Sequence, residues 1–306
     1  MKKIFLLAIL LLMSFLDVNA QQSPHYTQYM YNMNIINPAY AGSKENLSFG
    51  LLYRKQWIQI EDAPSTFSFS GSSPVGKNVG LGLSILSDRI GPVEENNLYG
   101  DFSYTLNLGG EKRLALGLKA GVTFQKIGLN SIIYPTLPDV NDGAFRENTN
   151  NQKLNIGTGL FYYTDNYYLA FSIPSMLKTV HLDYNGRKYG TEIQHYFLTG
   201  GYVFDINEDV KLKPSTMIKM VSGAPIETDI NLNVWLKDLL GFGASYRTGD
   251  AFVGMVELQA TSNLRFGYAY DMPFNPLKYF TKGSHELMLR YEIGNFKTKI
   301  KSTRYF

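Results

Sequence analysis

The chain has 306 residues, with 22 Tyr, 19 Phe, 28 Gly, no cysteine and a formal net charge of +3. The small charge, without any run of Lys or Arg, excludes a basic arm for nucleic acid. The absence of cysteine excludes thiol chemistry, a disulfide scaffold and a lipidated N-terminal Cys. The many Tyr and Phe residues suit the lipid-facing strands of a membrane barrel, and they also suit a large secreted β-sandwich.

The first twenty residues have the form of an export signal. Lys2 and Lys3 precede the apolar run 4–12, and small or medium side chains end at Ala20. We therefore expect a signal peptide over residues 1–20 that is cleaved after Ala20. No later segment approaches the ~18 uninterrupted apolar residues of a membrane-spanning helix, so insertion into a membrane would require a barrel.

Residues 21–44 do not form a good strand. Pro24, Pro38 and Gly42 interrupt them, no alternation is sustained, and Tyr, Asn and Met are frequent. We expect an N-terminal periplasmic or plug segment that packs inside the barrel or at its periplasmic mouth. A free, disordered tail is the alternative.

Apolar and polar side chains alternate along much of the chain, most clearly near residue 290. There, the two alternating sets are His285, Leu287, Leu289, Tyr291, Ile293 and Ser284, Glu286, Met288, Arg290, Glu292. Side chains along a strand point to opposite faces in turn, so such a strand has one apolar and one polar face. About fourteen such strands behind an export signal predict an all-β fold, a transmembrane antiparallel β-barrel with an apolar outside and a polar lumen.

The predicted barrel covers residues 45–294, and residues 295–306 follow it as a C-terminal tail. Single-chain outer-membrane barrels have an even number of strands, and fourteen satisfies this requirement. The strands are expected over 45–56, 65–72, 78–87, 95–108, 112–126, 152–163, 167–174, 192–206, 209–221, 226–237, 240–247, 251–260, 263–272 and 283–294.

Alternate connections between these strands differ in length. The even-numbered connections are tight and rich in turn formers, whereas 127–151, 175–191 and 272–282 are long. Long loops of outer-membrane barrels are extracellular and tight turns are periplasmic. This sorting favours the barrel over the sandwich, although two odd-numbered connections, 222–225 and 248–250, are also short.

The expected register turns charges of both signs toward the lumen. These are Arg113, Lys119, Lys211, Lys213, Lys219, Glu227, Asp229, Glu257, Arg265, Glu286, Arg290 and Glu292. A charge on the lipid face costs about 2–4 kcal/mol near the midplane, which explains their near-absence from the apolar set. We expect these charges to pair with one another, so that the lumen is structural and not conductive.

No pattern of residues indicates catalysis, a cofactor or a metal site. There is no G-x-S-x-G, Walker-type or H-E-x-x-H motif, and Ser284 and His285 point to opposite faces of one strand. The acidic loop 139–143 departs from the spacing of a calcium loop. Glycines two apart on one strand face are expected to allow close packing against a plug or a bend. They are Gly80 with Gly82, Gly157 with Gly159, and Gly241 with Gly243.

Several motifs, spread over the whole length, resemble those of one family. They are Tyr26-Thr27-Gln28-Tyr29-Met30, Asn37-Pro38-Ala39-Tyr40-Ala41-Gly42, Tyr53-Arg54-Lys55-Gln56-Trp57, Ala63-Pro64-Ser65-Thr66, Asp88-Arg89-Ile90-Gly91-Pro92, Tyr268-Ala269-Tyr270-Asp271, Gly283-Ser284-His285-Glu286-Leu287 and Arg304-Tyr305-Phe306. The chain is thus similar to the PorP/SprF family of outer-membrane proteins associated with type IX secretion and gliding motility.

Three motif residues also have a simple physical interpretation. Trp57, at the end of the first predicted strand, suits an aromatic girdle position. Tyr305 and Phe306 resemble the aromatic end that barrels present to their assembly machinery, unless the tail 295–306 is a periplasmic docking segment.

The resemblance implies a non-enzymatic outer-membrane protein with two alternative roles. The favoured role is to bind and anchor a secreted protein with a type B C-terminal domain, such as an adhesin, at the cell surface. The other is a core secretion component that connects the outer membrane to a periplasmic ring of lipoproteins. A solute channel or transporter of hydrophobic substrates is a third hypothesis, since fourteen strands enclose enough space for a small molecule.

We expect a secreted partner to bind the extracellular loops 127–151, 175–191 and 272–282. Exposed aromatic side chains in such loops often mark partner sites, or they merely close the barrel. The candidate anchors are Tyr134, Phe145, Tyr184, Tyr189 and Phe274.

Overall fold

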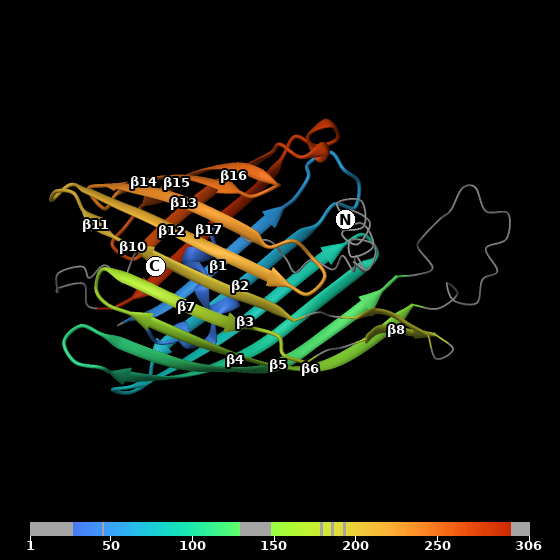
Figure 1. Cartoon of the computed structure of the whole chain (residues 1–306), viewed down its shortest axis with the longest axis horizontal. Coiled ribbons are helices and arrows are strands. Elements are labelled where there is room, and N and C mark those ends of the chain that lie inside the picture. The colour runs from blue at the N-terminus through green and yellow to red at the C-terminus, as the bar shows by residue number, and fades with distance from the viewer. Residues whose placement is uncertain are drawn as a thin grey trace, which may run out of the picture.

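The structure is a computed structural model. It describes residues 27–44, 46–128, 148–177, 180–184, 187–191 and 194–294, with 180–184 and 187–191 described by their backbone alone. These parts form a closed barrel of fourteen antiparallel strands, with neighbours in sequence order around the wall (Figure 1). The predicted fold class is confirmed.

The strands of the barrel wall cover most of the described chain. They are β1 (Leu47–Lys55), β2 (Ser65–Pro74), β3 (Val79–Ile90), β4 (Val93–Asn107), β5 (Arg113–Ile127), β6 (Thr149–Tyr163), β7 (Tyr167–Ile173), β10 (His195–Tyr202), β12 (Val210–Val221), β13 (Glu227–Leu236), β14 (Leu240–Arg247), β15 (Ala251–Gln259), β16 (Leu264–Pro273) and β17 (Ser284–Ile293). The wall closes where β1 pairs with β17.

Three short strands accompany the wall. The two-residue strand β11 (Phe204–Asp205) follows β10 after Val203 and also pairs with β12. Strands β8 (Val180–Tyr184) and β9 (Arg187–Thr191) form a separate hairpin within the connection from β7 to β10. The sequence pattern predicts a loop over 175–191, whereas the structure has this hairpin there.

The predicted connection at residues 88–94 is wrong. Strands β3 and β4 stay paired up to Ile90 and Val93, and a two-residue turn with Gly91 at φ +55° joins them. The side chains of Arg89 and Glu94 are 62 % and 45 % exposed. The ends of both strands carry exposed charged residues, so the alternation of apolar and polar residues stops before the backbone pairing of β3 and β4 ends.

The two faces of the wall differ as the alternation predicts. On β5, for example, Leu116 and Leu118 are 42 % and 62 % exposed, whereas Ala115 and Lys119 are buried. The other predicted luminal charges are buried or half-buried as well. The outward side chains therefore form the apolar surface that lipid requires. The described residues contain no helix long and apolar enough to cross a membrane.

The two ends of the barrel differ in their connections (Figure 1). At one end, the even-numbered connections are short turns, such as Lys237–Leu239 between β13 and β14. At the other end lie the long connections, including the β8–β9 hairpin and the 3₁₀-helix η5 (Pro276–Tyr279). Since long loops of outer-membrane barrels face outward, this second end is the extracellular end.

The N-terminal segment 27–44 lies inside the barrel. It contains η1 (Tyr29–Tyr31), the single turn α2 (Met33–Ile36) and η2 (Pro38–Tyr40), and nearly all of its side chains are buried. Figure 1 shows these blue turns surrounded by the strands. Tyr40 packs edge-on against Phe161 of β6, with ring centroids 5.2 Å apart. We refer to residues 27–44 as the plug; its position inside the barrel agrees with the predicted architecture.

Glycines on the inner faces of β3, β5 and β6 let the plug backbone approach the wall. A Cβ atom on Gly117 would lie 2.1 Å from the backbone nitrogen of Ala39. Similar overlaps would arise at Gly80, with the carbonyl of Ala41, and at Gly159. Gly80 and Gly159 thus show the predicted close packing against the plug, whereas a Cβ atom on Gly157 would meet the backbone of Ile173 and Pro174. Gly241 and Gly243, in contrast, face side chains of the barrel itself.

Candidate functional site

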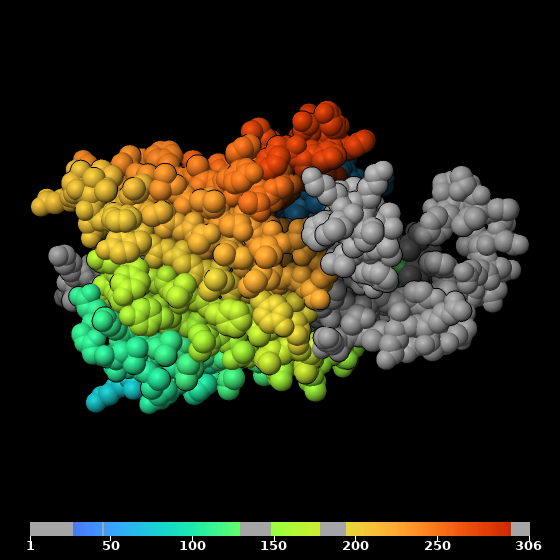
Figure 2. All heavy atoms as spheres, viewed as in Figure 1, coloured from blue at the N-terminus to red at the C-terminus, as the bar shows by residue number. Residues whose placement is uncertain are grey.

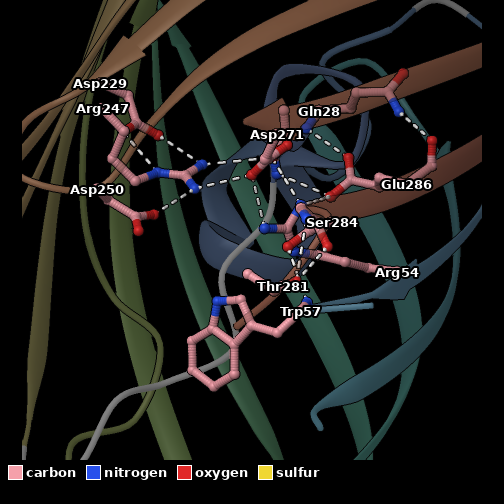
Figure 3. A network of polar contacts seen from close by, with 12 residues as sticks. Gln28, Arg54, Trp57, Asp229, Arg247, Asp250, Asp271, Thr281, Ser284 and Glu286 are labelled. Carbon is pink, nitrogen blue, oxygen red and sulfur yellow. Dashed lines mark hydrogen bonds and ion pairs between the residues drawn. The ribbon is translucent and has the colours of Figure 1, made fainter. Parts of the chain in front are cut away.

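Five charged residues from five strands meet inside the extracellular half of the lumen. They are Arg54 on β1, Asp229 on β13, Arg247 on β14, Asp271 on β16 and Glu286 on β17, and we refer to them as the arginine cluster. The nearest nitrogen and oxygen atoms are 2.7 Å apart for Arg54 and Asp271, and 3.4 Å for Arg54 and Glu286. The corresponding distances are 3.0 Å for Arg247 and Asp229, and 3.1 Å for Arg247 and Asp271 (Figure 3).

The strand register explains how these residues meet. Arg54 and Glu286 are direct neighbours across the β1–β17 pair, and Asp229 is opposite Arg247 across the β13–β14 pair. All five side chains are at most 3 % exposed. Buried charges are tolerated only when they are paired and hydrogen-bonded, and each arginine here contacts at least two carboxylates.

The arginine cluster holds the start of the plug. The backbone N–H groups of Thr27 and Gln28 donate to the two oxygens of Glu286, over 2.9 Å and 2.6 Å. The hydroxyl of Thr27 donates to Asp271 over 2.9 Å and accepts from Arg54 over 2.8 Å. Four separate sequence motifs thereby converge on one contact between the plug and the wall.

A second set of polar contacts lies deeper in the lumen and involves Tyr29 and Tyr31 of the plug. Glu257 accepts hydrogen bonds from Tyr31 and from Trp235, and it pairs with Arg265 over 3.3 Å. The amide of Asn231 donates to the hydroxyl of Tyr29 over 3.0 Å. Luminal charges thus pair with one another, as the sequence predicts.

A third polar layer lies at the periplasmic end of the plug. The ammonium group of Lys44 lies 3.7 Å from Glu292, which also pairs with Arg290. The plug is therefore fixed to the wall by polar contacts along its whole length, from Thr27 to Lys44.

A cavity of about 560 Å³ lies on the outer wall and a cavity of about 400 Å³ lies at the extracellular mouth. The outer one is lined by apolar side chains of β1, β2 and β14–β17 that face lipid. The cavity at the mouth, which we term the vestibule, has Arg54 and Asp271 at its floor. Trp57, Glu227 and Asp250 contribute to its sides.

The loop 56–64 shapes one side of the vestibule. Three of its non-glycine residues have positive φ angles: Trp57 at +46°, Gln59 at +86° and Asp62 at +54°. Such conformations cost of order 1–3 kcal/mol each and persist only where the surroundings enforce them. Two hydrogen bonds hold the loop. The N–H of Trp57 donates to Ser284 over 3.2 Å, and the N–H of Ile58 donates to the carbonyl of Gly283.

The interpretation of Trp57 as a girdle residue is wrong. The residue follows β1 in a left-handed conformation, is half-buried, and faces the vestibule in place of the lipid. Figure 3 shows its indole projecting away from the arginine cluster. The alternation of β1 ends at Lys55, so the face of the next side chains does not follow from the strand period.

The other motif residues serve the plug and the extracellular turns. Asn37 caps η2, Pro38 begins it, and Gly42 has φ +69° before β1. Pro64 accepts a backbone hydrogen bond from Gln56, and Pro92 accepts one from Gly128.

The remaining described motif residues lie near strand ends. Asp88 accepts a hydrogen bond from Thr66 over 2.5 Å, and Gly283 has φ +99° just before β17. His285 faces outward, where its Nδ1 atom lies 2.6 Å from the hydroxyl of Tyr268. Its side chain is therefore on the wall face opposite to Ser284 and Glu286, as predicted. Tyr305 and Phe306 lie outside the described residues.

Of the candidate partner anchors, only Phe274 has a described side chain. It is half-buried and stacks on Tyr246 at 5.8 Å and against Phe252 at 5.2 Å, on the outer face of the wall. Tyr134 and Phe145 lie outside the described residues, and the backbone alone is described for Tyr184 and Tyr189.

Several residues of this region are absent from the predicted site. Tyr279 and Phe280, in the predicted loop 272–282, are 78 % and 69 % exposed, the largest exposed aromatic pair among the described residues. Figure 2 shows this region as a red protrusion at the extracellular end. Asp229 is predicted only as a luminal charge and Thr27 only as part of a motif, and Arg247 is not among the predicted luminal charges. Which partners these residues meet depends on the strand register and the closure of the wall. Tyr279 and Phe280 could have been found in the sequence as two adjacent aromatic residues within a predicted loop.

Within the described part of the chain, no group of three or more His, Asp or Glu side chains is arranged to hold a metal ion. The mouth of the barrel presents charged, hydrogen-bonding and aromatic side chains. This combination defines the class of protein: an outer-membrane β-barrel whose lumen is filled by its own N-terminal segment.

The family model described as "Type IX secretion system membrane protein PorP/SprF" matches residues 18–291. The chain therefore belongs to the PorP/SprF family, and it is an outer-membrane component of type IX secretion. A comparison with curated protein sequences gave no match.

Solved structures of outer-membrane barrels resemble the fold. The toluene transporter TbuX of Ralstonia pickettii is 11% identical, with a TM-score of 0.51, over 86% of this chain and 92% of its own. The monoaromatic hydrocarbon channel CymD is 10% identical, with a TM-score of 0.52, over 88% and 94% of the two chains. At such low identity, the likeness concerns the barrel alone.

Proposed function

We propose that this barrel is a non-enzymatic anchor, which binds a secreted protein with a type B C-terminal domain and retains it at the cell surface. The membership of the PorP/SprF family supports a place in type IX secretion. The difference between the two ends of the barrel favours a partner on the outside over a partner in the periplasm.

The main support for this function is the shape and surface of the extracellular end of the barrel. It combines the vestibule, the strained loop 56–64 and the exposed aromatic pair Tyr279 and Phe280. Aromatic side chains are enriched at protein interfaces because they contribute much contact area at low entropic cost. The short periplasmic turns offer much less surface for a partner.

The plug weighs against the hypothesis of a solute channel. Its polar contacts reach from Glu286 at the extracellular end to Glu292 at the periplasmic end, and its backbone abuts the glycines of β3, β5 and β6. A solute could cross only if these contacts were broken. The barrel therefore functions with a closed lumen.

The proposal is tested by following the surface protein. The native barrel is first cross-linked in cells, purified in mild detergent, and its partner is identified by mass spectrometry. We expect a large exported protein with a type B C-terminal domain. In a strain that lacks the barrel, this protein should appear in the medium, and the reintroduced wild type should return it to the cells.

A matched pair of variants locates the contact. Tyr279→Ala with Phe280→Ala should lower the amount of retained protein at least severalfold, because the variant removes the exposed aromatic pair. Tyr291→Ala, which removes a lipid-facing aromatic side chain that is 41 % exposed, is the control. If periplasmic lipoproteins copurify and the export of all substrates stops without the barrel, the protein is the secretion core component and the anchor proposal is wrong.

A further inference from the structure

The charged residues around the vestibule do not balance. The arginine cluster continues into three further residues: Asp250, whose carboxylate lies 3.2 Å from Arg247, Glu227, 3.8 Å from Arg247, and Lys219, opposite Glu227 across the β12–β13 pair. Among the described residues, this network has five carboxylates and three cations. It therefore carries two negative charges in excess.

The accessible part of this network is acidic. The side chains of Arg54 and Arg247 are 2 % exposed and point toward buried carboxylates, and Lys219 is 7 % exposed as a residue. The side chains of Glu227 and Asp250 are 21 % and 30 % exposed and line the vestibule. A ligand that enters from outside thus meets carboxylate oxygens before it meets a cation.

The vestibule also offers a surface for the stem of a long side chain. Trp57, Pro273 and Leu277 contribute to its lining, and the indole of Trp57 projects away from the arginine cluster (Figure 3). Aromatic faces attract cations, and the methylene stems of Lys and Arg pack on apolar surface while their charged ends reach acceptors.

We propose that the vestibule is a binding site for a basic side chain, Lys or Arg, from an extended segment of the secreted partner. This inference rests on the proposed anchoring function and deepens it by naming what the partner must present. The cationic group lies between Glu227 and Asp250, its stem packs against Trp57, and it neutralises the excess negative charge of the network. A side chain without a positive charge leaves that excess uncompensated.

The test measures peptide binding to the purified full-length barrel in detergent by Trp57 fluorescence. The probes are an acetylated, amidated Gly-Arg-Gly peptide and its citrulline counterpart, which has nearly the same shape without the charge. The Trp57→Phe variant supplies the background from Trp235, the second tryptophan of the chain. We expect saturable binding of the arginine peptide, at least tenfold weaker binding of the citrulline peptide, and weaker binding at high salt.

Two variants assign the binding to the vestibule. Glu227→Gln combined with Asp250→Asn should weaken binding of the arginine peptide at least tenfold. Glu94→Gln, which removes an exposed carboxylate at the β3–β4 turn, should leave it unchanged. Heat-dependent mobility in gel electrophoresis shows whether each variant is folded, and Glu227→Gln alone replaces the double variant if that one does not fold.

The proposal is overturned if both peptides bind equally, or if the folded carboxylate variant binds the arginine peptide as the wild type does. In that case, protons bound by the carboxylates of the network would neutralise its excess negative charge. The result of the peptide-binding test is independent of the result of the test of the anchoring function. If the peptide binds as expected but the surface protein stays on cells without the barrel, the site stands and the anchoring function fails.

Discussion

Among single residues, Arg54 has three partners inside the lumen. It pairs with Asp271 and Glu286 and donates to the hydroxyl of Thr27, with only 2 % of its side chain exposed. It thereby connects three parts of the chain that are far apart in sequence. Removal of one partner from a buried ion pair leaves an unpaired charge, which costs about 3–5 kcal/mol.

Arg54→Leu should therefore destabilise the barrel by about 3–5 kcal/mol, because Asp271 and Glu286 lose a buried partner. The measurement is the temperature at which the folded, fast-migrating form disappears in gel electrophoresis. Arg89→Leu is the control, since Arg89 pairs with Glu94 at the surface, where such pairs contribute about 0–1 kcal/mol. Equal effects of the two variants would contradict the importance of the cluster.

The inner glycines give a second prediction at this scale. Gly117→Val should prevent the plug from seating, because even a Cβ atom at this position would lie 2.1 Å from the nitrogen of Ala39. Gly254→Val is the matched control, since Gly254 faces outward on β15 and a Cβ atom there meets nothing within 4 Å. Protease digestion in detergent should cut the plug in the first variant, whereas in the second it should stay intact.

At the scale of elements, the position of the plug can be tested by cross-linking. The chain has no cysteine, so an introduced pair can react only with itself. Ser70 of β2 donates to the side chain of Asn32 over 2.5 Å. Asn32→Cys with Ser70→Cys should thus be bridged in whole cells by a short thiol-reactive linker, as measured by the mobility of the unfolded protein.

The control for this pair uses the neighbouring residue. Phe69 is adjacent to Ser70 but points to the outer face of β2. Asn32→Cys with Phe69→Cys should therefore give no bridge. A bridge in both pairs, or in neither, would mean that the plug does not occupy the lumen in the cell.

Elements could be predicted from the sequence wherever the membrane imposes a pattern. The alternation along β5, β13 and β17 fixes both the strand and its faces, because each outward charge would be costly. The strand ends were harder to predict. The pattern predicts a loop over residues 88–94 because the outward face of these strand ends is charged, as at Arg89 and Glu94.

The candidate site could be predicted only in part. The motifs around Gln28, Arg54, Asp271 and Glu286 were each visible, but their meeting depends on the closure of the wall, which a period of two does not encode. The face of Trp57 does not follow from the alternation, because the residue lies beyond β1 with a φ angle of +46° and its N–H donates to Ser284, the first residue of β17.

At the scale of the whole molecule, the closed lumen has an electrical consequence. The wild-type barrel in a planar bilayer should show no steady conductance, because Glu286 holds one end of the plug by hydrogen bonds and Glu292 holds the other by an ion pair with Lys44. Glu286→Gln should give brief openings, since the backbone of Thr27 and Gln28 loses a charged acceptor. Single-channel recording is the measurement, and steady conductance of the wild type would contradict a closed lumen.

The contact of Glu286 with both Arg54 and Thr27 also bears on biogenesis. The plug and β1 lie near the start of the described chain, whereas Glu286 belongs to β17, the last of the described strands. Until that strand arrives, the wall stands open beside β1 and the start of the plug has no carboxylate to receive its N–H groups. The contact between the plug and Glu286 therefore depends on the closure of the wall by β17, and a chain truncated before β17 lacks both the closing strand and this carboxylate.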